Sequence, residues 1–235
     1  LLSTGVFGFF ISTDLFTMFM FYEVALIPMY LLIGVWGSGR KEYAAMKLTL
    51  MLMGGSAFLL IGILGIYYGA GAETMNILEI VKHQIPTEMQ RIFFPMVFLG
   101  FGVLGALFPF HTWSPDGHAS APTAVSMLHA GVLMKLGGYG CFRIAMYLMP
   151  TGAAIWGDFF LVLTTISVVY GAFSAVVQTD LKYINAYSSV SHCGLVLFAL
   201  LMMTRVSATG AILQMLSHGL MTALFFALIG MIYGR

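Results

Sequence analysis

Long runs of apolar residues, separated by short polar segments, fill the chain from end to end. A helix that crosses the hydrocarbon core of a bilayer needs about 20 mostly apolar residues. Strands of a membrane β-barrel would alternate apolar and polar positions, whereas these runs are continuous, so we expect helices. The sequence therefore predicts an all-α, polytopic transmembrane helix bundle. Eight runs are candidate spans, and the first is short: Leu1–Ser12, Asp14–Trp36, Tyr43–Tyr68, Ile92–Phe110, Thr123–Leu148, Gly157–Gln178, Ile184–Met203 and Ala208–Tyr233.

The polar segments between the runs mark the expected helix ends. Asp14 and Asp158 are each placed to cap the run that follows, since a carboxylate accepts hydrogen bonds from the free N–H groups of a first turn. Gly37–Glu42 is a polar turn. The longest loop is Ala70–Gln90, in which Glu73–His83 has the pattern of a short amphipathic surface helix. We expect residues 1–235 to form a single integral-membrane domain.

The composition supports a membrane protein. Of 235 residues, 60% are hydrophobic and 8% are charged, against about 25% charged in soluble domains. This excludes a soluble globular enzyme and a disordered chain. The net charge of +1 gives no electrostatic footprint for nucleic acid. Cys141 and Cys193 have neither disulfide-framework nor zinc-ligand spacing. The chain begins inside an apolar run, so we expect it to be a segment of a longer protein embedded in a lipid bilayer.

Glu23 is the first charge placed well inside a predicted helix. An ionisable group at mid-membrane costs roughly 2.5–3.5 kcal/mol on insertion scales, which suggests that it has a use. Pro28 lacks an N–H, so the carbonyl of Val24 loses its helical donor and becomes available to water beside the carboxylate. A neighbouring hydroxyl satisfying Glu23 is the alternative. Lys47, early in the next run, either extends to the membrane surface or reaches across to Glu23.

Lys135 lies deeper than any other lysine in a predicted span. It is twelve residues beyond Thr123, about 18 Å of helix rise, which is too deep for its side chain to reach the surface easily. Removal from water favours the neutral form of a lysine and makes proton exchange accessible. A structural ion pair is the alternative. Small residues around it allow close helix packing that shields it from lipid: Gly131, Gly137, Gly138 and Gly140.

Three histidines lie inside three different predicted helices. His129 precedes Lys135 by six residues, and His192 and His218 follow in the last two runs, with Gln214 one turn before His218. Imidazole exchanges protons near neutral pH, and ionisable groups inside membranes often mark proton or water paths. A buried histidine that is simply hydrogen-bonded is the alternative for each.

Pro109–Pro122 interrupts the helical pattern with three prolines and many polar groups. Irregular backbone at membrane depth is tolerated only where protein buries it or where it lines a cavity. An ordinary surface loop is the other interpretation, and spacing alone leaves both open.

Several segments, in the same order along nearly the whole chain, resemble the antiporter-like subunits of respiratory complex I, with most similarity to the M type, also called chain 4. One of them contains the break, Phe108–Ser126, which reads FPFHTWSPDGHASAPTAVS, and the next follows it, Leu128–Gly140, which reads LHAGVLMKLGGYG. The others are Phe21–Tyr30, Tyr43–Lys47, Gln178–Gly194 and Ser217–Leu220.

The resemblance implies a fourteen-helix fold with inverted repeats, of which this chain would cover about seven to eight helices, with the broken helix on Ile92–Pro122. The family's glutamate would fall on Glu23, its lysine on Lys135, and its axis histidines on His192 and His218. The related L-type subunit has a histidine where His129 stands.

The resemblance also implies a function, namely proton translocation coupled to electron transfer from NADH to quinone in other subunits. Sister antiporter-like subunits and other membrane subunits of complex I would be partners, in a bacterial plasma membrane. NAD, FMN, iron–sulfur clusters and quinone would belong to partner subunits, with no cofactor bound by this chain. We expect proton transfer at six residues: Glu23, Lys135, His218, Lys47, His129 and His192.

One position departs from the family pattern. The family usually has a lysine before the break that pairs with the glutamate, and here the position is Leu104. Glu23 would then need Lys47 or Lys135 as a substitute partner. Three other functions stay open: a subunit of a multisubunit cation/proton antiporter, a subunit of a membrane-bound hydrogenase, and a structural scaffold that moves no ion.

Overall fold

The computed structural model describes residues 1–233, and within them the chain forms helices and no β-strand. The only β-type pairing among these residues is an isolated bridge between Asp14 and Asn76. The elements are α1 (Leu2–Ile11), α2 (Leu15–Trp36), α3 (Lys41–Ala70), α4 (Ile77–Ile80), α5 (Thr87–Leu104), α6 (Trp113–Ser120), α7 (Thr123–Leu128), the π-helix η1 (His129–Leu133), α8 (Met134–Gly140), the π-helix η2 (Cys141–Met146), α9 (Pro150–Val176), α10 (Leu181–Leu201) and α11 (Arg205–Tyr233).

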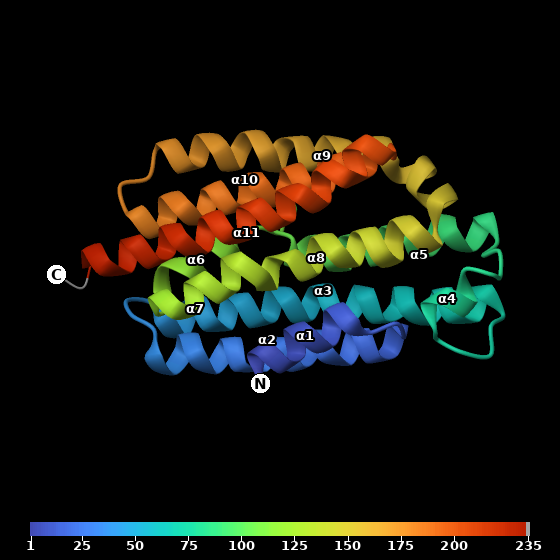
Figure 1. Cartoon of the computed structure of the whole chain (residues 1–235), viewed down its shortest axis with the longest axis horizontal. Coiled ribbons are helices and arrows are strands. Elements are labelled where there is room, and N and C mark those ends of the chain that lie inside the picture. Colours follow the sequence, from blue (N-terminus) through green and yellow to red (C-terminus); the bar gives the residue numbers. More distant parts are fainter. Residues whose placement is uncertain (234–235) are drawn as a thin grey trace.

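The long helices run roughly parallel to one axis of the molecule (Figure 1). In that view α1, α2 and α3 form the lower part, α9, α10 and α11 the upper part, and the segment from α5 to α8 lies between them. The helix pairs α3–α5, α9–α10, α10–α11 and α1–α2 pack along their lengths. The chain from α5 to η2 is therefore the central part of the bundle, and it carries the predicted break.

Within residues 1–233, five helices are long and apolar enough to cross a membrane: α2, α3, α9, α10 and α11. One further predicted run is made by shorter pieces placed end to end. Between Thr123 and Met146 the chain forms α7, η1, α8 and η2 without interruption, close to the predicted run Thr123–Leu148. The structure therefore confirms an integral, multi-pass helical membrane protein.

The predicted break is confirmed, with different helix bounds. α5 ends at Leu104, before the predicted end at Phe110, because the chain turns at Gly105 and Ala106, whose φ is 56°. The short helix α6 follows, and an extended Ala121 leads to Pro122 and α7. A turn thus separates α6 from α5, and an extended residue separates it from α7.

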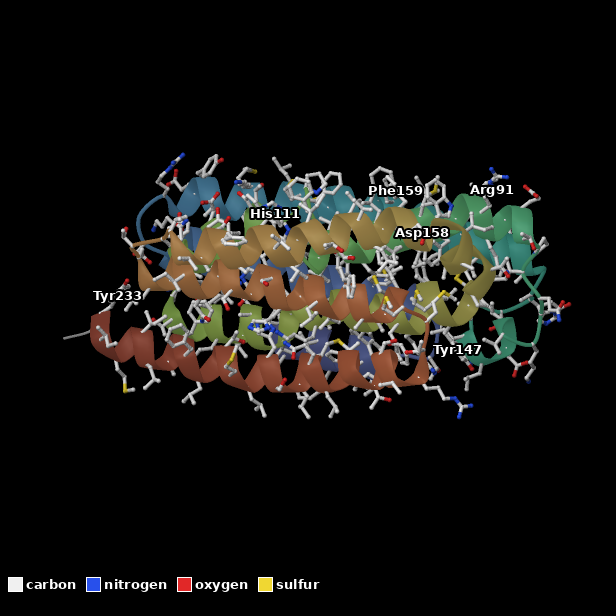
Figure 2. The ribbon with its side chains drawn as sticks, turned by 90° about the horizontal axis from the view of Figure 1, so that it is seen from above. Arg91, His111, Tyr147, Asp158, Phe159 and Tyr233 are labelled. Carbon is white, nitrogen blue, oxygen red and sulfur yellow. The ribbon has the colours of Figure 1, made fainter. Side chains whose placement is uncertain are left out.

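One predicted helix cap is confirmed and one is wrong. The Asp14 carboxylate accepts a 2.9 Å hydrogen bond from the Thr17 N–H at the start of α2. Asp158 caps nothing, because α9 already begins at Pro150, seven residues before the predicted start at Gly157, and Asp158 is exposed on its side (Figure 2). Proline is favoured at a first helical position, where its missing N–H has no partner to lose.

The predicted surface helix over Glu73–His83 is also too long. Only the four residues of α4 are helical there, with the Asn76 side chain accepting a 2.9 Å hydrogen bond from the Leu78 N–H. Leu15 and Ile77 bond to the backbone of the opposite segment at Met75 and Thr13, which ties this loop to the start of α2.

Candidate functional site

Lys135 lies in α8 at the centre of the bundle with 7% of its surface exposed. Its Nζ is 2.8 Å from Nδ1 of His218 on α11, and it also donates to the carbonyl oxygen of Ala130 in η1. An ammonium group has no acceptor, so in this contact the lysine donates and Nδ1 accepts when Lys135 is charged. Among residues 1–233, Lys135 forms no ion pair, which was the alternative that the sequence left open.

Close backbone packing brings Lys135 and His218 together. A Cβ added at Gly219 would lie 2.8 Å from the carbonyl oxygen of Gly131, so α11 touches η1 backbone to backbone. On the next turn, a Cβ at Gly138 would lie 2.8 Å from the sulfur of Met215. The close packing predicted from the glycines around Lys135 is thus present, and it holds the amine away from the surface.

A second histidine extends this contact toward α10. The rings of His218 and His192 have centroids 4.9 Å apart, and Nδ1 of His192 is 2.8 Å from Nε2 of Gln214. Gln214 therefore contacts His192 and not the neighbouring ring on its own helix. We call Lys135, His218, His192 and Gln214 the lysine–histidine row; it joins α8, α11 and α10.

A small cavity borders the row. It has a volume of about 10 Å³ and is lined in part by Lys135, His218 and Cys193. A space of roughly 10–15 Å³ by this measure accommodates one water molecule. One water there would have an amine and an imidazole as hydrogen-bond partners, so the space suits a proton carrier.

His129 lies at the first residue of η1, fully buried, with its ring against that of His118. The two ring centroids are 4.1 Å apart, and the Trp113 ring also stacks on His129, with a centroid distance of 5.3 Å. Within residues 1–233, none of the four imidazole nitrogens of this pair has a hydrogen-bond partner. The pair is therefore a place where buried, titratable nitrogens are free to bind water or exchange protons.

His118 was missed by the sequence analysis. It stands inside the interrupted segment Pro109–Pro122, which the pattern left as either a loop or a cavity lining, so it was not counted with the membrane histidines. The chain is helical at His118, and the His118 side chain is fully buried. His111, labelled in Figure 2, is a further buried histidine of the segment and has its ring centroid 5.0 Å from that of Tyr170 on α9.

Glu23 lies in α2, five residues before Pro28, which is inside the helix as predicted. Its Oε1 is buried and has no hydrogen-bond partner among the residues that the structure describes. The Ser56 hydroxyl of α3 lies next to the carboxyl group. Leu104, where the family usually has lysine, is fully buried in the apolar core.

The suggested pairing of Lys47 with Glu23 is wrong. The Lys47 Nζ is 2.7 Å from Oδ2 of Asp116 on α6, and the other carboxylate oxygen, Oδ1, accepts a 3.1 Å hydrogen bond from the Tyr183 hydroxyl on α10. The sequence offered no sign of this contact, because Lys47 and Asp116 are 69 positions apart and the break that turns α6 toward α3 intervenes. The six predicted residues thus occupy four places: the lysine–histidine row, the His118–His129 pair, the surroundings of Glu23, and the contact of Lys47 with Asp116.

These groups are proton donors and acceptors. Among residues 1–233, histidine, cysteine, aspartate and glutamate side chains form no group of three or more that could hold a metal ion. An amine and an imidazole within hydrogen-bond reach of each other pass protons, which is the chemistry that the contact between Lys135 and His218 supports.

Known proteins are similar to this chain in sequence and in fold. Residues 12–235 match the family described as "NADH:quinone oxidoreductase/Mrp antiporter, TM". The chain is 42% identical over 233 residues to NAD(P)H-quinone oxidoreductase chain 4, chloroplastic, of Citrus sinensis, covering 99% of this chain and 47% of the relative. It is 38% identical over 229 residues to NADH-quinone oxidoreductase subunit M of Rickettsia prowazekii, covering 97% and 46%.

The same similarity appears among solved structures. A chain of respiratory complex I from Thermus thermophilus with bound NADH superposes with a TM-score of 0.95 at 29% identity, over 100% of this chain and 50% of that chain. The chain spans about half the length of the curated relatives that it matches. With the family match extending over nearly all of the sequence, the chain belongs to the transmembrane family of NADH:quinone oxidoreductase and Mrp antiporter subunits.

Proposed function

We propose that this chain is part of a proton-translocating membrane subunit of an NADH:quinone oxidoreductase of the complex I type. In this proposal it moves protons across the membrane, and the driving energy comes from electron transfer between NADH and quinone in other subunits. NAD, FMN, iron–sulfur clusters and quinone belong to those partner subunits. The partners in the membrane are sister antiporter-like subunits, and the membrane is a bacterial plasma membrane.

The observation that carries the proposal is the lysine–histidine row. The Lys135 amine lies 2.8 Å from Nδ1 of His218, and the Gln214 amide lies 2.8 Å from Nδ1 of His192. The two imidazole rings between them have centroids 4.9 Å apart. The row crosses three helices at the centre of the bundle, where an uncompensated charge is costly. A purely structural scaffold has no need for such a row, since apolar packing would hold these helices together without that cost.

The proposed roles follow from chemistry and position. Lys135 loads and releases a proton, with His218 as its direct exchange partner and His192 as the next station. Glu23 is a second loading group, with the free carbonyl before Pro28 as a contact for water. When two titratable groups interact, removing a charge from one changes the proton affinity of the other, and this is how such a relay moves protons in steps.

The test is proton pumping by the complete complex, with Glu23→Gln and Lys135→Ala in the full-length protein, reconstituted in lipid vesicles. Quinone-dependent proton uptake is measured with a pH-sensitive dye, alongside NADH oxidation. Since a positioned acid or base contributes roughly 10²–10⁴-fold to proton transfer, we expect each substitution to slow pumping by at least about tenfold. Normal pumping in both variants would sink the assignment of these roles.

Matched controls come from exposed residues of the same chain. Glu88 lies in the first turn of α5 and Lys82 follows α4, and both are exposed. Glu88→Gln and Lys82→Ala make the same chemical changes outside the interior. We expect both controls to pump as the unmodified complex does, which would separate the loss of an interior proton carrier from a general effect of removing a charge.

A second function is favoured by one observation, since the matching family includes Mrp antiporter subunits as well as NADH:quinone oxidoreductase subunits. In that case a sodium or other cation gradient replaces electron transfer as the coupled process. Purification of the assembled complex distinguishes the two, because only an oxidoreductase carries flavin and iron–sulfur absorbance and oxidises NADH. The two relatives reported above are both named as quinone oxidoreductase chains, which favours the first function.

A further inference from the structure

The short helix α6 carries one of the two histidines of the His118–His129 pair, yet it has non-helical backbone on both sides. It has only eight residues, between the turn after α5 and the extended residues before α7. A helix of two turns has little stability of its own, so its position depends on the contacts that hold it. The arrangement of the histidine pair therefore depends on what fixes α6.

Neutral contacts hold α6 on its buried side. The Trp113 indole N–H donates a 3.0 Å hydrogen bond to the carbonyl oxygen of Val103 at the end of α5. Ser38, in the turn between α2 and α3, donates its backbone N–H to the carbonyl oxygen of Ser120 at 2.8 Å. These contacts tie the two ends of α6 to its neighbours in the bundle.

Asp116 ties the middle of α6 to two more helices. One carboxylate oxygen pairs with Lys47 of α3 at 2.7 Å, and the other accepts from the Tyr183 hydroxyl of α10 at 3.1 Å. The side chain is 27% exposed and that of Lys47 is 24% exposed, so this contact lies between the surface and the interior. Among residues 1–233, it is the one ion pair that joins separate helices, since Lys82 and Glu79 are three residues apart in the chain.

The Asp116 carboxylate thus contacts the Lys47 ammonium of α3 and the Tyr183 hydroxyl of α10. Both contacts hold the same two-turn helix, α6, in position. His118 follows Asp116 by two residues, and a Cβ at the intervening Gly117 would lie 3.4 Å from Cε1 of His129. A displacement of α6 that breaks the Asp116 contacts therefore changes the spacing of the two imidazole rings.

We propose that Asp116 is a positioning residue, whose carboxylate links Lys47 to Tyr183 and thereby holds the His118 ring against His129. The histidine pair, and not Asp116, exchanges the proton. This inference rests on the proposed function, in which the buried histidines take part in proton transfer. It assigns a shared role to Asp116, Lys47 and Tyr183, which neither the motifs nor the pattern of intramembrane charges had linked.

The experiment compares charge with shape at position 116, in the full-length protein within its reconstituted complex. Asp116→Asn keeps the size of the side chain and removes its charge, whereas Asp116→Glu keeps the charge and lengthens the side chain. We expect Asp116→Asn to slow proton pumping about tenfold, because a displacement of about 1 Å costs up to roughly 10²-fold in a positioned reaction. We expect Asp116→Glu to retain most of the activity.

The position of α6 is measured directly by hydrogen exchange of its amides, followed by mass spectrometry on the resting complex. Faster exchange of residues 113–120 in Asp116→Asn, with recovery in Asp116→Glu, is the expected result. Tyr183→Phe removes a single hydroxyl group and is the variant that decides the matter if Asp116→Asn fails to assemble. We expect it to slow pumping by about two- to fivefold, in line with the loss of one ordinary, partly exposed hydrogen bond.

Glu79→Gln is the matched control, since it breaks an ion pair of the same length, 2.7 Å, on the exposed helix α4. It is expected to leave both pumping and the exchange of α6 unchanged. Normal pumping in Asp116→Asn and Tyr183→Phe, or equal loss in Asp116→Asn and Asp116→Glu, overturns the positioning role. Because the hydrogen-exchange result does not depend on pumping, it stays interpretable if Lys135→Ala pumps normally and the proposed function itself fails.

Discussion

Replacing Gly219 with alanine tests whether backbone contact between α11 and η1 sets the distance from Lys135 to His218. The new methyl group would lie 2.8 Å from the Gly131 carbonyl oxygen, and ordinary contact begins at 3.4 Å, so the helices must separate by 3.4 − 2.8 = 0.6 Å. Overpacking of this kind costs about 1–3 kcal/mol. Alanine also gains about 0.5–1 kcal/mol over glycine in a helix, which partly hides the clash.

Gly210→Ala on the same helix removes this ambiguity. A Cβ there meets no atom within 4 Å, so the substitution carries the same helix preference and no clash. The difference in unfolding free energy between the two variants therefore isolates the clash, and we expect Gly219→Ala to be less stable by about 1–3 kcal/mol. Gly131→Ala, whose Cβ would lie 3.3 Å from the Gly219 oxygen, should fall between them.

The same displacement acts on the site. Since His218 is the residue next to Gly219, its Nδ1 moves away from the Lys135 Nζ, from 2.8 Å toward a distance beyond the usual hydrogen-bond limit of about 3.2 Å. Proton pumping in reconstituted complex should then fall about tenfold in Gly219→Ala and stay unchanged in Gly210→Ala. The free energy of unfolding of each variant is measured by equilibrium unfolding in detergent. Equal stability and equal pumping in the two variants would refute the reasoning.

Two further predictions concern single polar side chains. Gln214→Ala removes the side-chain partner of His192 and should slow pumping several-fold, by about the contribution of one hydrogen bond. Gln178→Ala, which breaks a bond to the last turn of α9, should leave pumping unchanged in the same assay. Lys182→Met removes a buried amine that donates to two carbonyl oxygens at the end of α6, and should lower the unfolding free energy by about 1.5–3 kcal/mol, as measured by equilibrium unfolding. Lys82→Met, at an exposed position after α4, should change it by less than about 0.5 kcal/mol.

Much of the fold follows from local signals in the sequence. Each apolar run became a helix or a series of helical pieces, and the Asp14 carboxylate caps α2 as expected, because a cap depends only on neighbouring residues. Asp158 shows the limit of the same rule. A proline eight residues earlier offered a second helix start, and apolar residues between them allowed the helix to extend across both signals.

The site was less predictable, because its contacts join distant segments. The depth of Lys135 could be read from the sequence, but its contact with His218 depends on how closely α11 approaches η1. His118 and Asp116 were not recognised, since their positions depend on the direction in which α6 leaves the break. No local pattern in the sequence predicts the direction of α6, because it depends on tertiary contacts such as those of Asp116 with Lys47 and Tyr183.

Interruptions of regular helix occur next to the proposed proton carriers. Pro28 frees a carbonyl beside Glu23, and the π-helix η1 begins at His129 and includes Ala130, whose carbonyl accepts from Lys135. A regular helix inside a membrane uses nearly all its carbonyl oxygens internally, so it offers a buried cation nothing to bind. Shifted or freed carbonyls supply negative dipoles where a proton must rest, and π-bulges recur at functional sites for a similar reason. At Lys135 the irregular backbone therefore supports the charged, protonated amine, while the surrounding apolar helices keep that form from being so stable that the proton is not released.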